Sequence, residues 1–192
     1  ALAQDEATFF DPSQVNTTAK KTANGYNLNG KKKMIIDGQG ADAFLVVAKT
    51  EEDEIALFLV DASQKGISLQ TEVLLDAGTY ASLELNEVEI STNDRVSEPG
   101  KGPALLEQLN NTAAICLSAE MMGMIHAAYG QTIAYLQERQ QFGKRIGSYQ
   151  ALQHRAAKLF CEIELCKSIV IKALKALDEG AENIAELASL AK

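Results

Sequence analysis

Hydrophobic and polar positions follow two different periods along this chain of 192 residues. In its first half, apolar residues come in short runs or alternate with polar ones, as they do over Ser82–Ile90. Alternation with a period of two is typical of a strand with one buried face. Two apolar runs, Ala43–Ala48 and Ile55–Val60, flank the acidic segment Glu51–Glu54, which we expect to be a solvated hairpin tip. Residues 1–97 therefore predict about five to seven strands in a small antiparallel barrel or sandwich.

Two Asn-Gly pairs indicate tight turns between the first strands. Asn24-Gly25 predicts a hairpin between Thr17–Thr22 and Tyr26–Leu28, because both residue types accept the positive φ angles of a tight turn. Asn29-Gly30 predicts a second turn. The run Lys31-Lys32-Lys33 follows it, and we interpret this run as a solvated strand end.

The second half of the chain has the period of a helix. The stretch Pro99–Pro103 is rich in Pro and Gly and marks the boundary. From Pro103 to about Gln140 the pattern is apolar around most of the circumference, which predicts a helix buried on several sides. Further helices are expected from about Ser148 to Leu177 and from Asn183 onward.

These patterns predict an α+β chain with two domains. Residues 1–99 form the β-barrel or sandwich, and residues 103–192 form a helical bundle of about three helices. Three helices do not complete a bundle. We therefore expect an open apolar face on the helical domain, which marks an interface and predicts self-association.

Composition narrows the function classes. The net charge of -8 argues against a nucleic-acid surface, because phosphate binding needs clustered Lys and Arg. No apolar stretch is long enough for a membrane span, and the first residues lack a signal-peptide pattern, so we expect a cytoplasmic protein. Cys116, Cys161 and Cys166 fall in helical patterns and are expected to be reduced core thiols. No metal site is predicted, because His126 and His154 are not at ligand spacing with them.

The candidate chemistry lies where the first long helix ends. From Tyr135 to Gln150 the chain reads Y-x-x-x-R-x-Q-F-G-x-x-I-x-x-x-Q. This pattern resembles the C-terminal helical domain of the acyl-CoA dehydrogenases, flavoenzymes that desaturate acyl-CoA thioesters. Gly123 also lies at the family's spacing before Arg139, and the last six residues, Leu187–Lys192, are similar to its A-S-x-A-K segment.

The resemblance extends into the first half of the chain. Tyr26-x-Leu28-Asn29-Gly30-x-Lys32 is similar to the family's Y-x-L-N-G-x-K turn. Ala41-Asp42-x-Phe44 and Leu85-x-Glu87-Val88-x-Ile90 resemble two of its strands. The resemblance implies that residues 1–97 are the middle β-barrel domain and that residues 103–192 are the first part of the C-terminal domain. The family's N-terminal helical domain would lie upstream.

The resemblance also implies a cofactor, flavin adenine dinucleotide (FAD), and an acyl-CoA thioester as substrate. In the family a neighbouring subunit grips the diphosphate of FAD, and the enzymes are usually homotetramers. By their place in the motif, Arg139, Gln141 and Phe142 inherit that contact, and Tyr149 and Gln150 match a further pair beside it. A guanidinium suits the task because it holds two phosphate oxygens in a fork. Taken alone, Arg139 also fits a surface arginine near a helix C-terminus.

Several positions depart from the family where the chemistry takes place. The family's flavin loop reads T-E-P-x-A-G-S-D, and its hydroxyl position is Ala3 here. Its W-I-T/S segment is Met34-Ile35-Ile36, so the aromatic ring and the hydroxyl are both missing. The family's helix arginine is Ala114 here, and the position before it, which carries the catalytic glutamate in some members, is Ala113. In most members of the family that glutamate lies further downstream than this chain extends. We interpret Glu107 and Glu120 as surface residues, and the chain offers no catalytic residue.

Two functions within the family stay open. The first is a portion of an FAD-dependent oxidoreductase of fatty acid metabolism, inactive by itself because the base is not in this chain. The second is a non-catalytic or scaffold subunit that contributes to the FAD site of a second dehydrogenase subunit. An unrelated interaction module is the third alternative.

Overall fold

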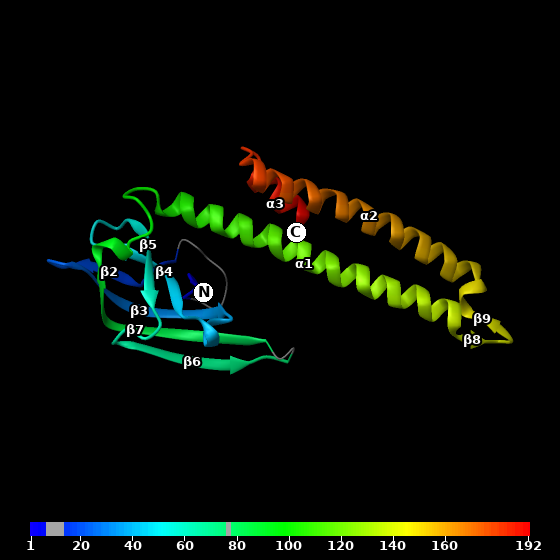
Figure 1. Cartoon of the computed structure of the whole chain (residues 1–192), viewed down its shortest axis with the longest axis horizontal. Helices are drawn as coiled ribbons and strands as arrows, with labels where there is room; N and C mark the ends of the chain where they lie inside the picture. The colour runs from blue at the N-terminus through cyan, green and yellow to red at the C-terminus, as the bar shows by residue number, and fades with distance from the viewer. Residues whose placement is uncertain (7–13, 76–77) are drawn as a thin grey trace. The chain divides into compact units, whose positions relative to one another are not determined.

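The computed structural model describes residues 1–6, 14–75 and 78–192, which divide into two units, residues 1–106 and 107–192 (Figure 1). The first unit is a sheet whose strands join in the order β1-β4-β2-β3-β7-β6, with β5 also paired to β4. The strands are β1 (Leu2–Ala3), β2 (Thr18–Lys21), β3 (Gly25–Ile36), β4 (Ala43–Thr50), β5 (Ile55–Asp61), β6 (Ile67–Val73) and β7 (Thr79–Ser91). Two short 3₁₀ turns, η1 (Gly38–Gly40) and η2 (Thr92–Asp94), follow β3 and β7.

The predicted fold class, a β domain followed by helices, is confirmed, but the sheet is mixed. β1 and β2 both run parallel to β4, with Leu2 opposite Leu45 and Thr18 opposite Lys49. The remaining pairs of the large sheet are antiparallel. Over the described residues β6 pairs only with β7, so the strands do not close into a barrel.

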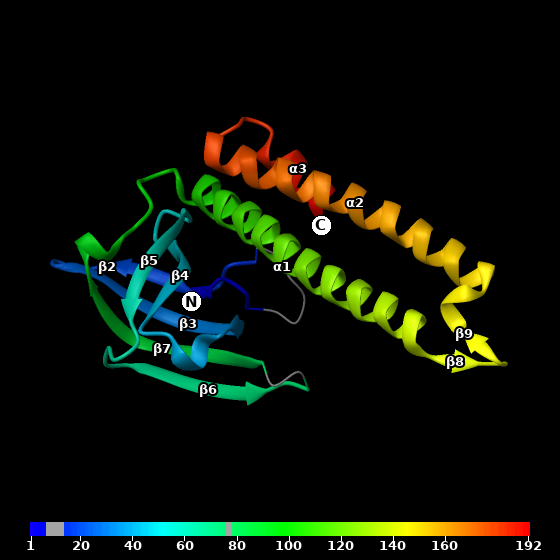
Figure 2. The ribbon, with the colours of Figure 1, turned by 45° about the vertical axis from the view of Figure 1, so that its right-hand side comes forward.

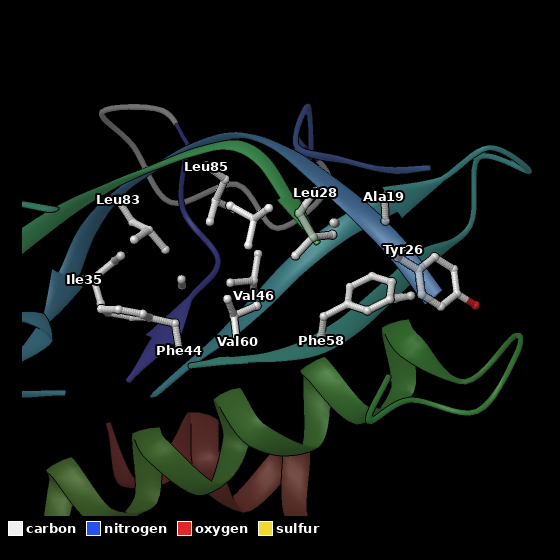
Figure 3. Packing of buried hydrophobic residues seen from close by; sticks show 14 of the residues in the cluster. Ala19, Tyr26, Leu28, Ile35, Phe44, Val46, Phe58, Val60, Leu83 and Leu85 are labelled. Atoms are coloured by element: carbon white, nitrogen blue, oxygen red, sulfur yellow. The ribbon is translucent and has the colours of Figure 1, made fainter. Parts of the chain in front are cut away.

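The core of the β unit lies inside the curved sheet (Figure 3). Phe44, Val46, Phe58 and Val60 come from neighbouring strands β4 and β5 and are wholly buried. Each such side chain contributes roughly 1.5–3 kcal/mol when it leaves water. The Tyr26 ring packs 5.0 Å from that of Phe58 and extends this core toward the β2–β3 hairpin.

The Asn24-Gly25 hairpin is present, but its turn works differently from the prediction. β2 and β3 are antiparallel with Lys21 opposite Tyr26, and neither Asn24 nor Gly25 has a positive φ. Gly25 is required for another reason, because a Cβ there would collide with the carbonyl group of Ile90 on β7. The prediction of a second turn at Asn29-Gly30 was wrong, because both residues lie inside β3 beside a register shift against β7.

The prediction of a solvated Lys31-Lys32-Lys33 run was wrong for its middle residue. Lys31 and Lys33 are exposed, whereas the Lys32 side chain is 0% exposed. Successive side chains of a strand point to opposite faces. Because Leu28 points into the core, Lys32 four residues later points the same way.

The acidic segment Glu51–Glu54, which we predicted to be solvated, is exposed only in part. It closes the β4–β5 hairpin as predicted, and its first three residues are exposed. Glu54, in contrast, is half-buried, and its Oε1 accepts hydrogen bonds from the Arg95 guanidinium at 2.6 Å and from the Gly100 amide at 2.5 Å. This carboxylate ties the segment before the first long helix to the sheet.

The helical unit is a long hairpin of α1 (Gly102–Glu138) and α2 (Gln150–Glu179), with the short helix α3 (Ile184–Ala191) folded back against α2 (Figures 1 and 2). Gly180, at a φ of 62°, ends α2. Ile115 of α1 packs with Ala173 and Ala176 of α2 and with Leu187 and Ala188 of α3. No helix among the described residues is long and apolar enough to cross a membrane.

The helices are less buried than their composition predicted. On α1 the side chains of Leu117, Met121, Met124 and Ile125 are exposed, so burial on several sides is not observed within this unit. Cys116, Cys161 and Cys166 carry free thiols as expected, but all three are exposed rather than in a core. The predicted open apolar face is therefore present.

Replacing Gly25 tests the close approach of β3 to β7. We expect Gly25→Ala to lower the free energy of unfolding by about 1–3 kcal/mol, because the added methyl overpacks against the backbone at Ile90. Urea denaturation followed by circular dichroism measures the change. Gly40→Ala is the matched control, since a Cβ at Gly40 meets nothing within 4 Å and should change stability by less than about 0.5 kcal/mol. Equal effects would contradict the close approach.

Candidate functional site

The five predicted cofactor-binding residues lie at one end of the helical unit, where α1 gives way to α2 (Figure 2). There a short hairpin of β8 (Gln140–Gln141) and β9 (Lys144–Arg145) is followed by the 3₁₀ turn η3 (Ile146–Ser148). We call residues 139–150 the tip. Gln140 pairs with Arg145 and Gln141 with Lys144, so the turn holds only Phe142 and Gly143.

The turn of the tip has an unusual backbone. Phe142 has a φ of 55° and Gly143 a φ of 77°, the two positive angles of the tight turn that suits a two-residue hairpin. Glycine adopts this conformation readily, whereas a bulky residue such as Phe does so at a cost of about 1–2 kcal/mol. The Phe142 side chain is 89% exposed. Residues held in uncommon backbone conformations cluster at active sites and ligand contacts.

Tyr149 organises the side chains around this turn. Its hydroxyl donates a hydrogen bond of 3.4 Å to the Gln141 carbonyl oxygen. The Lys144 ammonium lies 4.2 Å from the centre of the Tyr149 ring, an arrangement that attracts a cation to the negative face of the ring. The Phe142 ring meets the same tyrosine edge-on at 6.4 Å. Gln141, Phe142 and Lys144 are thus held together by one aromatic ring.

Arg139 and Gln150 are the first and the last residue of the tip. The Arg139 carbonyl accepts a hydrogen bond of 2.8 Å from the Ile146 amide, which fixes the base of the hairpin. Gln150 is the first residue of α2, a helix end whose free amides favour negative charge. Both side chains are exposed, and in the described part of the chain neither makes a hydrogen bond or ion pair to another residue.

The tip and the first turns of α2 are strongly basic although the chain is acidic. Residues 139–158 contain no Asp or Glu and hold five cations, Arg139, Lys144, Arg145, Arg155 and Lys158. Lys158 lies 3.8 Å from Glu162, whereas within the described ranges Arg139, Lys144 and Arg145 have no acidic partner. Unpaired cations on an exposed hairpin favour an anionic ligand. Lys144 and Arg145 were not predicted as site residues, although the lack of acids around them is visible in the sequence.

The positions expected near a flavin ring lie in the β unit. Ala3 is wholly buried on β1, whereas Met34 and Ile36 are exposed on β3, with Met34 at a φ of 54°. None of these three side chains offers a hydrogen-bonding group. They therefore present small and apolar surface where the family's pattern has hydroxyls and an aromatic ring.

The α1 positions compared with a catalytic glutamate and its following arginine have no side chain that can bind or transfer a proton. Ala113 and Ala114 carry methyl groups, and the nearby Glu107 and Glu120 are exposed, as expected for surface glutamates. Over the described residues no cluster of His, Cys, Asp and Glu could hold a metal ion.

Comparison with known proteins gives matches along nearly the whole chain. Residues 3–91 match the family described as acyl-CoA dehydrogenase, middle domain, and residues 100–192 match acyl-CoA dehydrogenase, C-terminal domain. The short/branched chain specific acyl-CoA dehydrogenase of Rattus norvegicus mitochondria is 30% identical over 95% of this chain and 44% of its own length. The chain spans about half the length of the curated relatives it matches.

Solved structures agree with these sequence matches. Butyryl-CoA dehydrogenase from Megasphaera elsdenii superposes with a TM-score of 0.92 at 26% identity, over 99% of this chain and 52% of that one. A chain of the ChsE4-ChsE5 complex from Mycobacterium tuberculosis superposes with a TM-score of 0.81 at 26% identity, over 99% of this chain and 49% of that one.

Replacing Gly143 tests the geometry of the tip. We expect Gly143→Ala to cost about 1 kcal/mol, because alanine is strained at this positive φ although its methyl would meet nothing within 4 Å. Faster hydrogen exchange of the Ile146 amide would report the loosened hairpin. Gly130→Ala in the middle of α1 is the control and should stabilise the helix by up to about 1 kcal/mol. A stabilising effect at both sites would show that the turn does not need its left-handed conformation.

Proposed function

Because the chain belongs to the acyl-CoA dehydrogenase family, we propose that it is a portion of an FAD-dependent enzyme that desaturates acyl-CoA thioesters between their α and β carbons. In this proposal residues 1–99 are the middle domain and residues 103–192 are the first part of the C-terminal domain. The observation that supports it most strongly is the exposed basic tip around Arg139, which is built to grip an anion.

The tip binds the diphosphate of an FAD that is held mainly by a neighbouring subunit. Arg139 supplies a forked pair of donors to the phosphate oxygens. Gln141 and Gln150 add amide donors on either side, and Tyr149 holds the hairpin in place through Gln141. Phe142, exposed at the turn, offers an apolar face to the adenosine part of the same molecule. These five residues bind and orient the cofactor and take no part in bond breaking.

The residues on the flavin-ring side fit the cofactor less well. Bound FAD would supply the hydride acceptor for the β carbon of the substrate, which is chemistry that no side chain can replace. Met34 and Ile36 are exposed and can pack against a ring, whereas Ala3 is wholly buried, and none of these side chains can hydrogen-bond to the ring. Removal of the α proton needs a carboxylate, and with Ala113 and Ala114 at the compared positions this chain does not provide that base.

A second candidate function follows from this asymmetry. The residues that would serve the chain's own flavin ring are changed, whereas those that would serve a neighbour's diphosphate are present. This pattern favours a non-catalytic or scaffold subunit that lends Arg139 to the FAD site of a second dehydrogenase subunit. One solved relative is itself a complex of two differently named chains. Co-purification with another dehydrogenase subunit supports this candidate, whereas dehydrogenase turnover by this chain's own gene product alone contradicts it.

Substitution of Arg139 tests the diphosphate contact. We expect FAD or ADP, titrated into the 192-residue chain, to shift the amide resonances of the tip. Arg139→Gln should weaken binding by about tenfold or more, because a hydrogen bond to a charged group contributes about 1.5–3 kcal/mol. Arg155→Gln is the matched control, since it removes the same charge five residues beyond Gln150, and it should weaken binding by less than about threefold.

Two results of this titration would contradict the proposal. One is the absence of any shift at the tip in the unmodified chain. The other is an equal loss of affinity in Arg139→Gln and Arg155→Gln, which would mean that only the overall charge of the helical unit matters.

The exposed apolar face predicts that the chain associates with itself, as a dimer or as part of a tetramer. On the helical unit the side chains of Leu117, Met121, Met124, Ile125, Phe160, Leu165 and Ile171 are exposed. Light scattering at micromolar concentration should therefore give a mass above the monomer's 20.7 kDa. The double change Leu165→Ser/Ile171→Ser should shift the chain toward monomer, and Val73→Ser at an exposed site of the β unit should not. A sharp monomer peak for the unmodified chain contradicts this prediction.

A further inference from the structure

A buried ion pair joins the first residues of the chain to β3. The Lys32 Nζ lies 2.6 Å from the Glu6 Oε1, and the two side chains are 0% and 7% exposed. The same ammonium also donates to the Gln4 carbonyl oxygen at 3.2 Å. A fully buried lysine is rare and is stable only when its charge is paired and hydrogen-bonded.

Glu6 is also bonded to the segment that leads into β2. Its Oε1 accepts from the Thr17 amide at 2.9 Å and from the Thr17 hydroxyl at 2.7 Å, and its Oε2 accepts from the Asn16 amide at 2.6 Å. One carboxylate thus connects three stretches of chain, the N-terminal segment 1–6, residues 16–17 and β3. Removing its charge would leave the Lys32 ammonium buried without its ion-pair partner, with the Gln4 carbonyl as its remaining hydrogen-bond acceptor.

Other contacts of residues 1–6 among the described residues are a hydrogen bond of 2.9 Å from the Ala1 ammonium to the Ala43 carbonyl and the burial of the Ala3 methyl in the core. β1 is only two residues long, and it lies along the edge of β4. The backbone bonds that anchor the segment include Leu45 N–H to the Ala1 carbonyl at 2.8 Å and Lys33 N–H to the Asp5 carbonyl at 2.7 Å. A strand of two residues makes few backbone hydrogen bonds. Within the described residues, the contact between Glu6 and Lys32 is the one ion pair that attaches this segment to the sheet.

We propose that the Glu6–Lys32 contact is a latch that holds residues 1–6 on the sheet, and that protonation of Glu6 opens it while the β3–β7 and β4–β5 pairings stay intact. Opening frees the edge of β4 at Leu45 and Val46. Nothing in this step needs a cofactor or a partner chain.

The direction of the pH dependence follows from Glu6. Burial alone raises the pKa of its carboxyl, but the hydrogen bonds from Lys32 and Thr17 outweigh burial, so the pKa lies below its ordinary value. A carboxyl with a lowered pKa in the folded state stabilises that state fully above its ordinary pKa of about 4.3. This contribution is lost as the pH falls through the lowered value, so the latch opens in acid.

Two other charged groups face the cluster among the described residues. Burial lowers the pKa of Lys32, against the pull of Glu6 and Asp5, yet acidification only adds protons and leaves this ammonium cationic. Burial raises the pKa of Asp5, and the charge of Lys32 opposes this shift. Protonation of Asp5 does not break the latch, because its contact with Lys33 uses the backbone carbonyl.

Hydrogen exchange on the full chain tests the latch residue by residue. Glu6→Gln keeps the shape of the side chain and mimics its protonated form. We expect the Lys33 and Leu45 amides to exchange roughly a hundredfold faster in this variant at neutral pH, because the buried Lys32 loses its counter-charge. The Leu57 and Val96 amides, bonded to Ser97 Oγ and the Leu57 carbonyl, report the part of the β unit where β5 meets residues 96–97, and they should stay protected.

Glu84→Gln is the matched control for the loss of a carboxylate. Glu84 pairs with Lys31 at 2.9 Å on the exposed face of the same sheet, so its removal should change exchange at Lys33 and Leu45 by less than about threefold. Equal effects of Glu6→Gln and Glu84→Gln overturn the latch. So does equal acceleration of all four amides, which would mean that Glu6 supports the whole unit.

Acidification of the unmodified chain provides the second measurement. After correction for intrinsic exchange, protection of the Lys33 and Leu45 amides should fall at a higher pH than protection of Leu57 and Val96. Simultaneous loss at all four amides overturns the proposal. If Glu6→Gln fails to fold, this comparison still decides between a latch and a global support.

The latch would matter for the proposed cofactor site, and this consequence rests on the proposed function. Ala3 lies on the latched segment, and Met34 lies two residues beyond Lys32 on β3, so the contact fixes both positions expected at the flavin ring. The exchange experiment needs no flavin. If FAD does not bind, the result of the exchange experiment still stands. If the exchange experiment contradicts the latch, the proposed contact of the tip with the diphosphate still stands.

Discussion

The β unit depends on hydrogen bonding along both edges of β4. One edge pairs with β5, and the other edge pairs with β1 and then with β2. Because Val46, Val47 and Ala48 are wholly buried, the backbone groups of β4 cannot turn to water and must find partners in neighbouring strands. The two short parallel strands meet this requirement, and the buried carboxylate of Glu6 joins the segments that carry them. The sheet therefore uses a buried charge to complete its most apolar strand.

The candidate site has a different physical character in each unit. The tip of the helical unit is exposed and basic, and its hairpin backbone is ordered by strand pairing and by the contacts of Tyr149 with the Gln141 carbonyl and the Lys144 ammonium. Such preorganisation lowers the entropy lost on binding. The compared positions in the β unit are apolar or buried and provide packing surface only. These two features fit the proposed contact with a cofactor's phosphates better than they fit chemistry at its ring.

The sequence predicted the elements well where a single period governs them. The alternation in Ser82–Ile90 and the long helical pattern after Pro103 correspond to β7 and α1. The prediction did not extend to the burial of Lys32, because nothing local in the sequence indicates that Glu6 lies opposite it across the fold. It also missed that Gly25 serves a close contact with β7 rather than a special turn. The exposed thiols of α1 and α2 were misplaced because a helical pattern alone cannot tell which apolar face has a partner.

The charges of the helical unit are distributed unevenly along its length. Residues 139–158 hold five cations and no Asp or Glu, whereas residues 178–192 hold Asp178, Glu179, Glu182 and Glu186 with the single cation Lys192. With α2 at 30 residues, the two ends are separated by about 45 Å. In dilute salt an approaching anion is attracted by the cations of the tip, and the field of the anion turns the tip toward it before contact. At physiological ionic strength the Debye length is about 8 Å, and the orienting effect is confined to the last step of the encounter.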